Sequence, residues 1–339
     1  MPAKKHLGTQ TFLIEGEVRI IGSGCVAGPL ESEGPLKNTF DLASTDPFFD
    51  KDTWEQAESN MLYKAAIFAA NKASKPLSSI DVAFAGDLLN QCMSSCFAFR
   101  TLALPLYGLF GACSTMAESL ALGAMSIDGG FSETALCGTS SHFSTAERQF
   151  RFPLEYGGKR TPTAQWTVTG AGMALLAAKG TGPCITHVTC GKVIDRGIID
   201  SSNMGAAMAP AAASTLEAHF KDASISPANY DLILTGDLGE LGKSILIDLM
   251  NDVGFDISNN YDDCGTLIFN TQDQDVACGG SGCGCSAVVL CGDILQRMAR
   301  SELNRILFIG TGALMSPTST MQGESIPAIA HAVSIVNKN

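Results

Sequence analysis

One short pattern occurs twice in this chain, 172 residues apart (from position 138 to position 310), and it limits the folds open to the chain. In each copy a Cys-Ser pair is followed by small and apolar residues and then by a segment containing Gly-Thr. Such ordered recurrence is typical of a duplicated supersecondary unit. The identical residues are Cys113 with Cys285, Ser114 with Ser286, Gly138-Thr139 with Gly310-Thr311, and Ser144 with Ser316. We therefore expect two similar halves whose helix N-termini meet around a pocket.

Short apolar runs bounded by Gly, Asp or Asn alternate with helical patterns along the chain. The expected strands are residues 18–24, 80–87, 134–138, 231–237 and 306–312, and the apolar segment 171–179 closes the first half. The clearest helix is 54–72, and an amphipathic helix is expected over 287–298. In helix 54–72 one face carries Ala57, Met61, Ala65 and Phe68, with Leu62 and Ala69 beside them. This alternation predicts an α/β architecture with buried sheets.

Composition narrows the possible partners and compartments. Hydrophobic residues make up 45% of the 339 residues and charged residues 17%, which is enough for a large core. The net charge of -12 argues against nucleic acid and against electrostatic docking on anionic lipid. Residues 8–19 mix polar and charged side chains, so no signal peptide is expected, and no apolar run of about 20 residues predicts a transmembrane helix. The twelve cysteines are expected to be mostly buried and reduced.

Cys113 lies at a predicted turn from loop to helix, in the sequence Gly111-Ala112-Cys113-Ser114. The positive field of a helix N-terminus favours the thiolate, which is the nucleophilic form of cysteine. This placement makes Cys113 a candidate nucleophile. Catalysis would still need a base supplied by the rest of the chain.

Several segments resemble the thiolase-fold superfamily of condensing enzymes. They are the Cys113 turn, the glycine-rich turn at 279–286, the final strand leading into Gly310-Thr311-Gly312, and the segment 167–172. The resemblance spans nearly the whole chain. It implies a five-layer α-β-α-β-α sandwich built from two duplicated halves, residues 1–178 with the Cys113 turn and residues 179–339, and it implies a homodimer.

The sequence departs from that superfamily at the positions that matter most for catalysis. Those enzymes use two histidines, or a histidine and an asparagine, from the second half. At the first position this chain has Thr235-Gly236-Asp237, and at the second it has Gly279-Gly280-Ser281. Imidazole is the side chain suited to proton transfer near neutral pH, and neither threonine nor glycine replaces it. Asp237 is a possible base, but its charge would raise the pKa of the thiol and repel an enolate. We therefore expect a site without catalytic residues.

A closer resemblance is to the stage V sporulation protein AD family of spore-forming bacteria. The residues that carry it include 152–157 (Phe-Pro-Leu-Glu-Tyr-Gly) and 162–167 (Pro-Thr-Ala-Gln-Trp-Thr), with further agreement at 12–14, 24–31 and 41–46. This resemblance implies binding of pyridine-2,6-dicarboxylic acid (dipicolinic acid) and its calcium complex. It also implies membrane proteins of the stage V sporulation A operon as partners, uptake of the ligand into the developing spore, and a peripheral location on the spore inner membrane. No cofactor is implied other than calcium carried as the chelate.

A pocket for this flat dianion needs N–H groups or cations, an apolar slot and, for calcium, oxygen ligands. Helix N-termini and glycine-rich turns offer N–H groups, arginines pair with carboxylates, and Asp237 is the candidate calcium ligand. The expected ligand-binding residues are Cys113, His142, Arg151, Arg160, Thr235, Gly236, Asp237, Gly279, Gly280, Ser281, Gly312 and Met315.

Two other hypotheses remain open on the sequence. The chain could be an active acyl-transferring or condensing enzyme that uses Cys113 with an unusual base, in which case the thiol would be acylated by acyl-coenzyme A. It could also be a scaffold that acts through its surface and binds no small molecule. His142 could equally be a loop histidine bonded to backbone, and the basic residues around position 151 could be a solvated loop.

Overall fold

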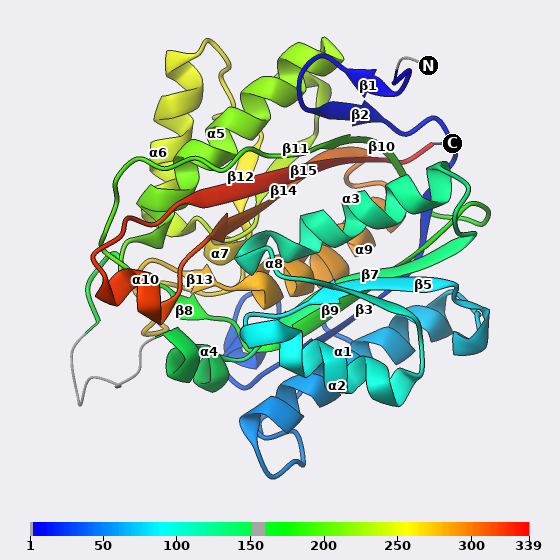
Figure 1. Ribbon diagram of the computed structural model, residues 1–339, viewed down its shortest axis with the longest axis horizontal. Coiled ribbons are helices and arrows are strands. Elements are labelled where there is room, and N and C mark those ends of the chain that lie inside the picture. The colour runs from blue at the N-terminus through cyan, green and yellow to red at the C-terminus, as the bar shows by residue number, and fades with distance from the viewer. Residues whose placement is uncertain (1–2, 151–159, 339) are drawn as a thin grey trace.

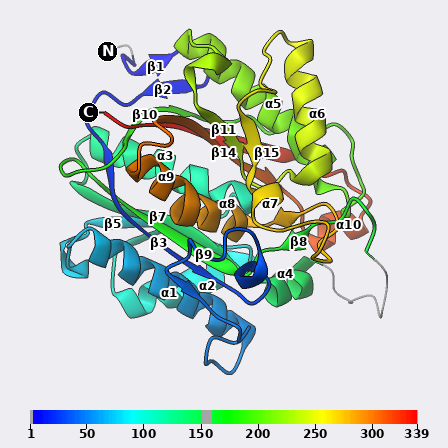
Figure 2. The ribbon, with the colours of Figure 1, turned by 180° about the vertical axis from the view of Figure 1, so that it is seen from behind.

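Helices and sheets alternate in five layers in the computed structural model, which describes residues 3–150 and 160–338 (Figure 1). Helices α5 and α6 form one outer layer and α1 and α2 the other. Between them lie two sheets, and α3, α8 and α9 fill the space between the sheets (Figure 2). This is the layered α/β arrangement expected from the sequence.

The elements have the following bounds. The strands are β1 (His6–Leu7), β2 (Thr11–Leu13), β3 (Arg19–Ala27), β4 (Leu42–Ala43), β5 (Val82–Gly86), β6 (Leu106–Leu109), β7 (Thr134–Ser141), β8 (Trp166–Thr167), β9 (Gly170–Ala177), β10 (Cys184–Thr189), β11 (Leu232–Thr235), β12 (Tyr261–Asp263), β13 (Gly280–Ser281), β14 (Arg305–Ala313) and β15 (Ala328–Val336). The helices are α1 (Trp54–Lys72), α2 (Met93–Leu102), α3 (Thr115–Asp128), α4 (Phe143–Phe150), α5 (Met204–Ala223), α6 (Gly239–Asp252), α7 (Cys264–Leu267), α8 (Cys283–Val289), α9 (Leu295–Ala299) and α10 (Pro317–Met321).

The two sheets have equivalent strand orders, each counted outward from the strand where the sheets meet, β3 in one and β10 in the other. One runs β3-β9-β7-β5-β6 and the other β10-β15-β14-β11-β12, and they touch where Cys184 of β10 pairs with Arg19 of β3. In each sheet the central strand, β7 or β14, pairs in parallel on one side and antiparallel on the other. Most strands of residues 1–178 form the first sheet and most of 179–339 the second. The exceptions are β1 and β2, which join the second sheet at β10, and β8 and β13, which pair with each other in a separate two-stranded sheet.

Helix α1 packs on the outer face of β3 through small residues on both sides. Its N-terminus is capped by Thr53, whose side chain accepts a hydrogen bond from the backbone N–H of Gln56, and such caps contribute about 1 kcal/mol. A Cβ atom on Gly24 would overlap the backbone of α1 at Ala65, so the helix can approach this strand only because position 24 is glycine. The predicted buried face is confirmed at Ala57, Met61, Leu62, Ala65 and Ala69, while Phe68 is half-buried.

The helix expected over 287–298 differs from its prediction. The structure forms α8, a π-helical segment (Leu290–Ile294) and α9 in succession, and residues 283–292 are all buried. Helix α8 lies between the two sheets and is covered all round, so it has no solvent-facing side that could make it amphipathic.

All twelve cysteines are free, and only Cys96 and Cys190 are exposed. Within residues 3–150 and 160–338, no helix is both long enough and apolar enough to cross a membrane.

Candidate functional site

Cys113 lies in a short 3-10 turn, Ala112–Ser114, that leads directly into α3. Strand β14 holds this turn from the other half of the chain. A Cβ atom on Gly312 would lie 2.6 Å from the carbonyl oxygen of Gly111 and 3.0 Å from the backbone nitrogen of Ser114. Because glycine leaves that space open, the last residues of β14 pack against the Cys113 turn and set its position in the site.

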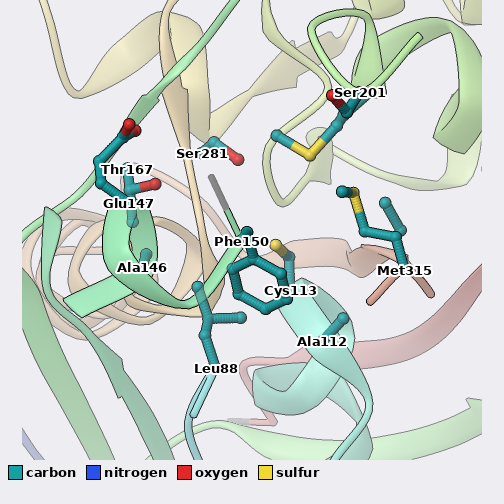
Figure 3. A pocket seen from close by; sticks show the side chains of 12 residues that line it. Leu88, Ala112, Cys113, Ala146, Glu147, Phe150, Thr167, Ser201, Ser281 and Met315 are labelled. Carbon is teal, nitrogen blue, oxygen red and sulfur yellow. The ribbon is translucent and has the colours of Figure 1, made fainter. Parts of the chain in front are cut away.

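A cavity with an empty volume of about 570 Å³, part of it open to solvent, lies over Cys113 (Figure 3). Its wall is mainly apolar, with a few polar side chains. The apolar residues are Leu88, Ala112, Ala146, Phe150, Met204, Ala313 and Met315, and the others are Cys113, Glu147, Thr167, Ser201 and Ser281. This lining, mainly apolar with a few polar groups, is usual for a small-molecule site. Both halves contribute, as the duplication predicted.

The Asp237 carboxyl lies beside Cys113 and is fully buried. Asp237 follows β11, and its side chain accepts hydrogen bonds from the Thr311 hydroxyl (2.7 Å), the Gly282 backbone N–H (2.9 Å) and the Ser281 hydroxyl (3.2 Å). Among the charged groups around Cys113, the Asp237 carboxylate has the largest effect on the pKa of the thiol. Asp237 connects the ends of β11 and β14 with the turn before α8, next to the cysteine turn.

These contacts keep Cys113 in the thiol form. Burial raises its pKa well above the ordinary value, and the Asp237 carboxylate raises the pKa further. Burial also raises the pKa of Asp237. The expectation that the helix N-terminus favours the thiolate is thus wrong, because loss of solvent and the neighbouring carboxylate outweigh the helix field. The described cavity wall contains no histidine that could accept the proton.

Asp263 and Gln165 hold the backbone next to Asp237 in place, and the sequence did not predict these contacts. The buried Asp263 carboxylate accepts hydrogen bonds from the Thr235 hydroxyl (2.7 Å) and from the backbone N–H groups of Leu238 (2.8 Å) and Gly239 (2.9 Å). Burial raises the pKa of Asp263 to about 7. The Gln165 amide donates to the carbonyl oxygens of Asp237 (2.7 Å) and Gly280 (2.9 Å). Gln165 lies in the 162–167 stretch that carried the family resemblance, but nothing in that stretch indicates this contact.

The structure brings only some of the expected residues into the cavity. Cys113, Ser281 and Met315 line it, and Ser281 pairs with Thr167 through the register of β13 with β8. The expected residues that lie behind the wall are Thr235, Gly236, Asp237, Gly279, Gly280 and Gly312. Thr235 points toward Asp263 and Tyr261 rather than the cavity, with its hydroxyl 2.8 Å from that of Tyr261.

The expected basic and imidazole groups lie elsewhere. His142 is buried outside the cavity lining: its Nε2 lies 2.8 Å from the Pro47 carbonyl oxygen, and its Nδ1 accepts from the Ser144 backbone N–H. Burial lowers the pKa of His142. The Arg160 guanidinium lies over the Trp166 ring, 4.4 Å from its centroid, and Trp166 stacks on Phe143. Arg151 falls outside the described residues.

Sequence reasoning missed most of the wall, including Glu147 and the pair Ser201 and Met204 that precedes and begins α5. One signal was available for Leu88. Gly86-Asp87-Leu88 and Gly236-Asp237-Leu238 are the same tripeptide at the ends of β5 and β11, which occupy equivalent places in the two sheets. This identity suggests that the first tripeptide, like the second, borders the site.

Comparisons with solved structures show the fold. The chain is similar to 3-oxoacyl-[acyl-carrier-protein] synthase III from Aquifex aeolicus VF5, with a TM-score of 0.60 and 12% identity over 94% of this chain and 99% of that one. It is also similar to the cerulenin-bound OleA of Xanthomonas campestris, with a TM-score of 0.62 and 15% identity over 99% of this chain and 99% of that one. The expected thiolase-like fold of two duplicated halves in five layers is confirmed.

Sequence comparisons identify the family. The stage V sporulation protein AD family matches residues 8–336. The stage V sporulation protein AD of Bacillus subtilis (strain 168) is 45% identical over 329 residues, which cover 97% of each chain. The chain therefore belongs to the stage V sporulation protein AD family.

Proposed function

We propose that this chain acts in sporulation by binding dipicolinic acid and its calcium complex in the Cys113 cavity, without catalysing a reaction. Family membership supports the role in sporulation. The observation that carries the non-catalytic part is the contact of the buried Asp237 carboxyl with the Cys113 thiol. A condensing enzyme needs a thiolate and hydrogen-bond donors for a developing oxyanion. Here the group beside the sulfur is the Asp237 carboxyl. Its charge disfavours the thiolate, and as an acceptor it does not donate to an oxyanion.

The wall of the cavity suits a flat ring with polar edges. Leu88, Phe150 and Met315 offer apolar surface, while the Thr167, Ser201 and Ser281 hydroxyls lie among them (Figure 3). This combination of an apolar slot and a few polar groups is the usual design of a small-ligand site.

The charges around the cavity support the calcium complex as a ligand. The described wall includes the Glu147 carboxylate and no lysine or arginine. Calcium compensates the charge of the two ligand carboxylates, and it takes further oxygen ligands from carboxylates and hydroxyls at roughly 2.3–2.6 Å. Glu147 and the neighbouring hydroxyls are such oxygens. Asp237, the ligand expected from the sequence, already accepts hydrogen bonds on both carboxylate oxygens and lies behind the wall, so a calcium role for it would require these bonds to break.

Calorimetric titration with dipicolinate, with and without calcium, tests the proposal. The matched variants are A146L, which fills the cavity from α4, and A299L, which makes the same change at an exposed position on α9. Saturable binding that is lost in A146L and kept in A299L supports the cavity as the site. Benzoate and acetyl-coenzyme A serve as comparison ligands. The enzyme hypothesis replaces this one if acetyl-coenzyme A acylates Cys113 and dipicolinate does not bind.

We further propose that the chain is a homodimer and works at the spore inner membrane as a peripheral component with membrane proteins of its operon. The proposal of a dimer is supported by strand β6, which ends its sheet and has no neighbour on its outer side among the described residues. Tyr107 on β6 is 65% exposed and Phe110, just after it, 55% exposed. An open strand edge with exposed aromatic side chains is a surface that a second copy can cover.

A further inference from the structure

A second cavity lies at the opposite end of β14 from the Cys113 site. Arg305 begins β14 and lines this cavity, whereas Ala313 ends β14 and lines the first one, so about 26 Å of strand separates them. The cavity has an empty volume of about 680 Å³, part of it open to solvent. Its described wall consists of Thr186, His187, Ile225, Tyr230, Arg305, Ser334, Val336, Asn337 and Lys338.

The charge of this wall is opposite to that of the whole chain. The net charge is -12, yet the described wall has two cations, Arg305 and Lys338, one histidine and no carboxylate. Two carboxylates close to these cations already have other partners. Asp231 accepts from the backbone N–H groups of Asn304 (2.7 Å) and Arg305 (2.9 Å), and Glu17 pairs with Arg19 (2.9 Å). Among the described residues, neither Arg305 nor Lys338 has a carboxylate within ion-pair distance.

A buried hydrogen-bond network supplies one more donor to the same wall. The Ser334 side chain, with the residue only 2% exposed, accepts from the Thr186 hydroxyl (3.1 Å) and from the Tyr230 hydroxyl (3.3 Å). A hydroxyl that accepts two hydrogen bonds still has its own proton to donate. No described protein atom accepts that proton, and Ser334 lines the cavity. Behind it, His219 Nε2 lies 2.7 Å from the Tyr230 hydroxyl. In the tautomer with the proton on Nε2, His219 donates to that hydroxyl and leaves the Tyr230 proton for Ser334.

We propose that this second cavity binds a small oxyanion, a carboxylate or phosphate group, between Arg305 and Lys338, with the Ser334 hydroxyl donating to it. The guanidinium of Arg305 matches the paired oxygens of either group. The site is independent of the Cys113 cavity and of the function proposed there.

His187 makes this binding dependent on pH. Its Nδ1 lies 3.1 Å from the Thr186 hydroxyl, and because that hydroxyl donates to Ser334, Nδ1 carries a proton and Nε2 is the nitrogen that titrates. Burial and the charge of Arg305 lower the pKa of His187. A bound anion offsets the charge of Arg305, so binding favours protonated His187 and becomes tighter as pH falls.

The other titratable groups near His187 keep their protonation state between about pH 5 and 8. Burial lowers the pKa of His219 to about 3 and raises that of Tyr230 to about 12. Burial raises the pKa of Asp222 behind His219, but hydrogen bonds from the backbone at positions 9–11 outweigh burial and lower that pKa. His187 is therefore the group that links binding to pH.

Calorimetric titration with inorganic phosphate and with succinate at pH 7 tests the site. R305Q removes the principal cation, and R300Q makes the same change in charge at an exposed position where Arg300 pairs with Glu302. We expect saturable binding that R305Q weakens by about tenfold or more and that R300Q leaves unchanged, because a hydrogen bond to a charged group contributes about 1.5–3 kcal/mol. If R305Q does not fold, K338Q takes its place. No saturable binding, or equal loss in R305Q and R300Q, overturns the proposal.

A second titration uses sulfate, whose charge does not change between pH 5 and 8. We expect tighter sulfate binding at pH 5.5 than at pH 8 in the unchanged chain, and a flat profile in H187Q. The A146L variant should bind sulfate like the unchanged chain, since its substitution lies in the other cavity. A profile that H187Q leaves unaltered contradicts the assignment of His187.

Discussion

The Asp237 carboxyl lies beside the Cys113 thiol, whose pKa it raises, and it accepts three hydrogen bonds, from Ser281, Gly282 and Thr311. Three segments of the second half thus meet at one carboxyl below the cysteine. In a condensing enzyme of this fold the same place needs a group that transfers protons. Here the carboxyl raises the pKa of the thiol, and this effect can be measured.

Replacing Asp237 with asparagine should make Cys113 more reactive. The neutral amide removes the negative charge that raises the pKa of the thiol, so the thiolate fraction at pH 8 should rise, about tenfold for each unit by which the pKa falls. The rate of iodoacetamide labelling at Cys113, followed by peptide mass spectrometry, measures this. Both chains should carry C96S and C190S, because those two thiols are exposed. Equal labelling rates would mean that burial alone sets the pKa.

Replacing Cys113 with alanine should leave dipicolinate binding largely intact. The thiol is one part of a wall made of many residues. The loss of affinity should stay below about tenfold, the range of one neutral hydrogen bond. Calorimetry of C113A against the unchanged chain measures it. Loss of all binding together with loss of an acyl adduct would instead indicate a nucleophile.

Replacing Gly312 with alanine should destabilise the chain and disturb the site together. The new Cβ atom would lie 2.6 Å from the Gly111 carbonyl oxygen, which is a backbone atom in the turn before Cys113. Such overpacking costs about 1–3 kcal/mol in the free energy of unfolding. Urea unfolding measures the stability and dipicolinate titration the effect on the cavity. If both are unchanged, β14 does not hold the cysteine turn.

Glu58 should make the chain less stable as pH rises. Burial, with a contribution from the nearby Asp87 carboxyl, raises the pKa of Glu58 from 4.5 to about 8, although the hydroxyls of Thr145 (2.7 Å) and Ser140 (3.2 Å) donate to it. Between these two pH values the folded chain keeps a proton that the unfolded chain has lost. The free energy of unfolding therefore falls as pH rises from about 5 to 8, and the full cost is present above about pH 8.

The E58Q variant has no group that titrates at this position. The free energy of unfolding of E58Q, measured in urea, should therefore exceed that of the unchanged chain by an amount that grows from pH 5 to pH 8. Glu217 offers a matched control, since it is a surface residue paired with Lys221 (2.6 Å). E217Q should follow the pH profile of the unchanged chain. A parallel profile for E58Q would show that Glu58 is ionised in the folded state.

Replacing Tyr107 with glutamate should dissociate the proposed dimer. The charge would fall on the outer strand of the sheet, where a second copy would have to bury it without a partner. Sedimentation velocity gives the oligomeric state. F131E is the matched control, because Phe131 is 88% exposed but lies in the turn between α3 and β7, away from β6. A dimer that survives Y107E and dissociates in F131E would move the interface to that turn.

The strands were predictable because each combines an apolar run with a polar or glycine boundary, as at 80–87 and 306–312. A single repeat spacing was less informative. The cysteine turns and the strands β7 and β14 repeat 172 residues apart, whereas Gly86-Asp87-Leu88 and Gly236-Asp237-Leu238 are separated by 150 (from position 86 to position 236). Insertions of different length between equivalent elements explain why one offset found only part of the duplication.

The site was harder to predict than the fold. The nearness of Asp237 to the cysteine, and the rise that its charge causes in the thiol pKa, followed from the sequence analysis. The larger effect of burial did not, since a sequence shows the start of a helix and not the loss of solvent around it. Glu147, Ser201 and Met204 come from segments with no motif, and only tertiary packing brings them to the cavity. His142 lies outside the cavity lining, because its ring nitrogens bond to the backbone of Pro47, from a distant segment, and of Ser144.

The cavity wall is shared between the halves, with Leu88 and Ala146 from one and Ser281 and Ala313 from the other. A ligand seated there acts as a cross-link between two parts of the chain that are otherwise joined by packing and by a few strand pairs. A bound ligand should therefore stabilise the chain against separation of the halves by force or by denaturant. This stabilisation should increase as the ligand concentration rises. Neither half produced alone would retain a complete binding site.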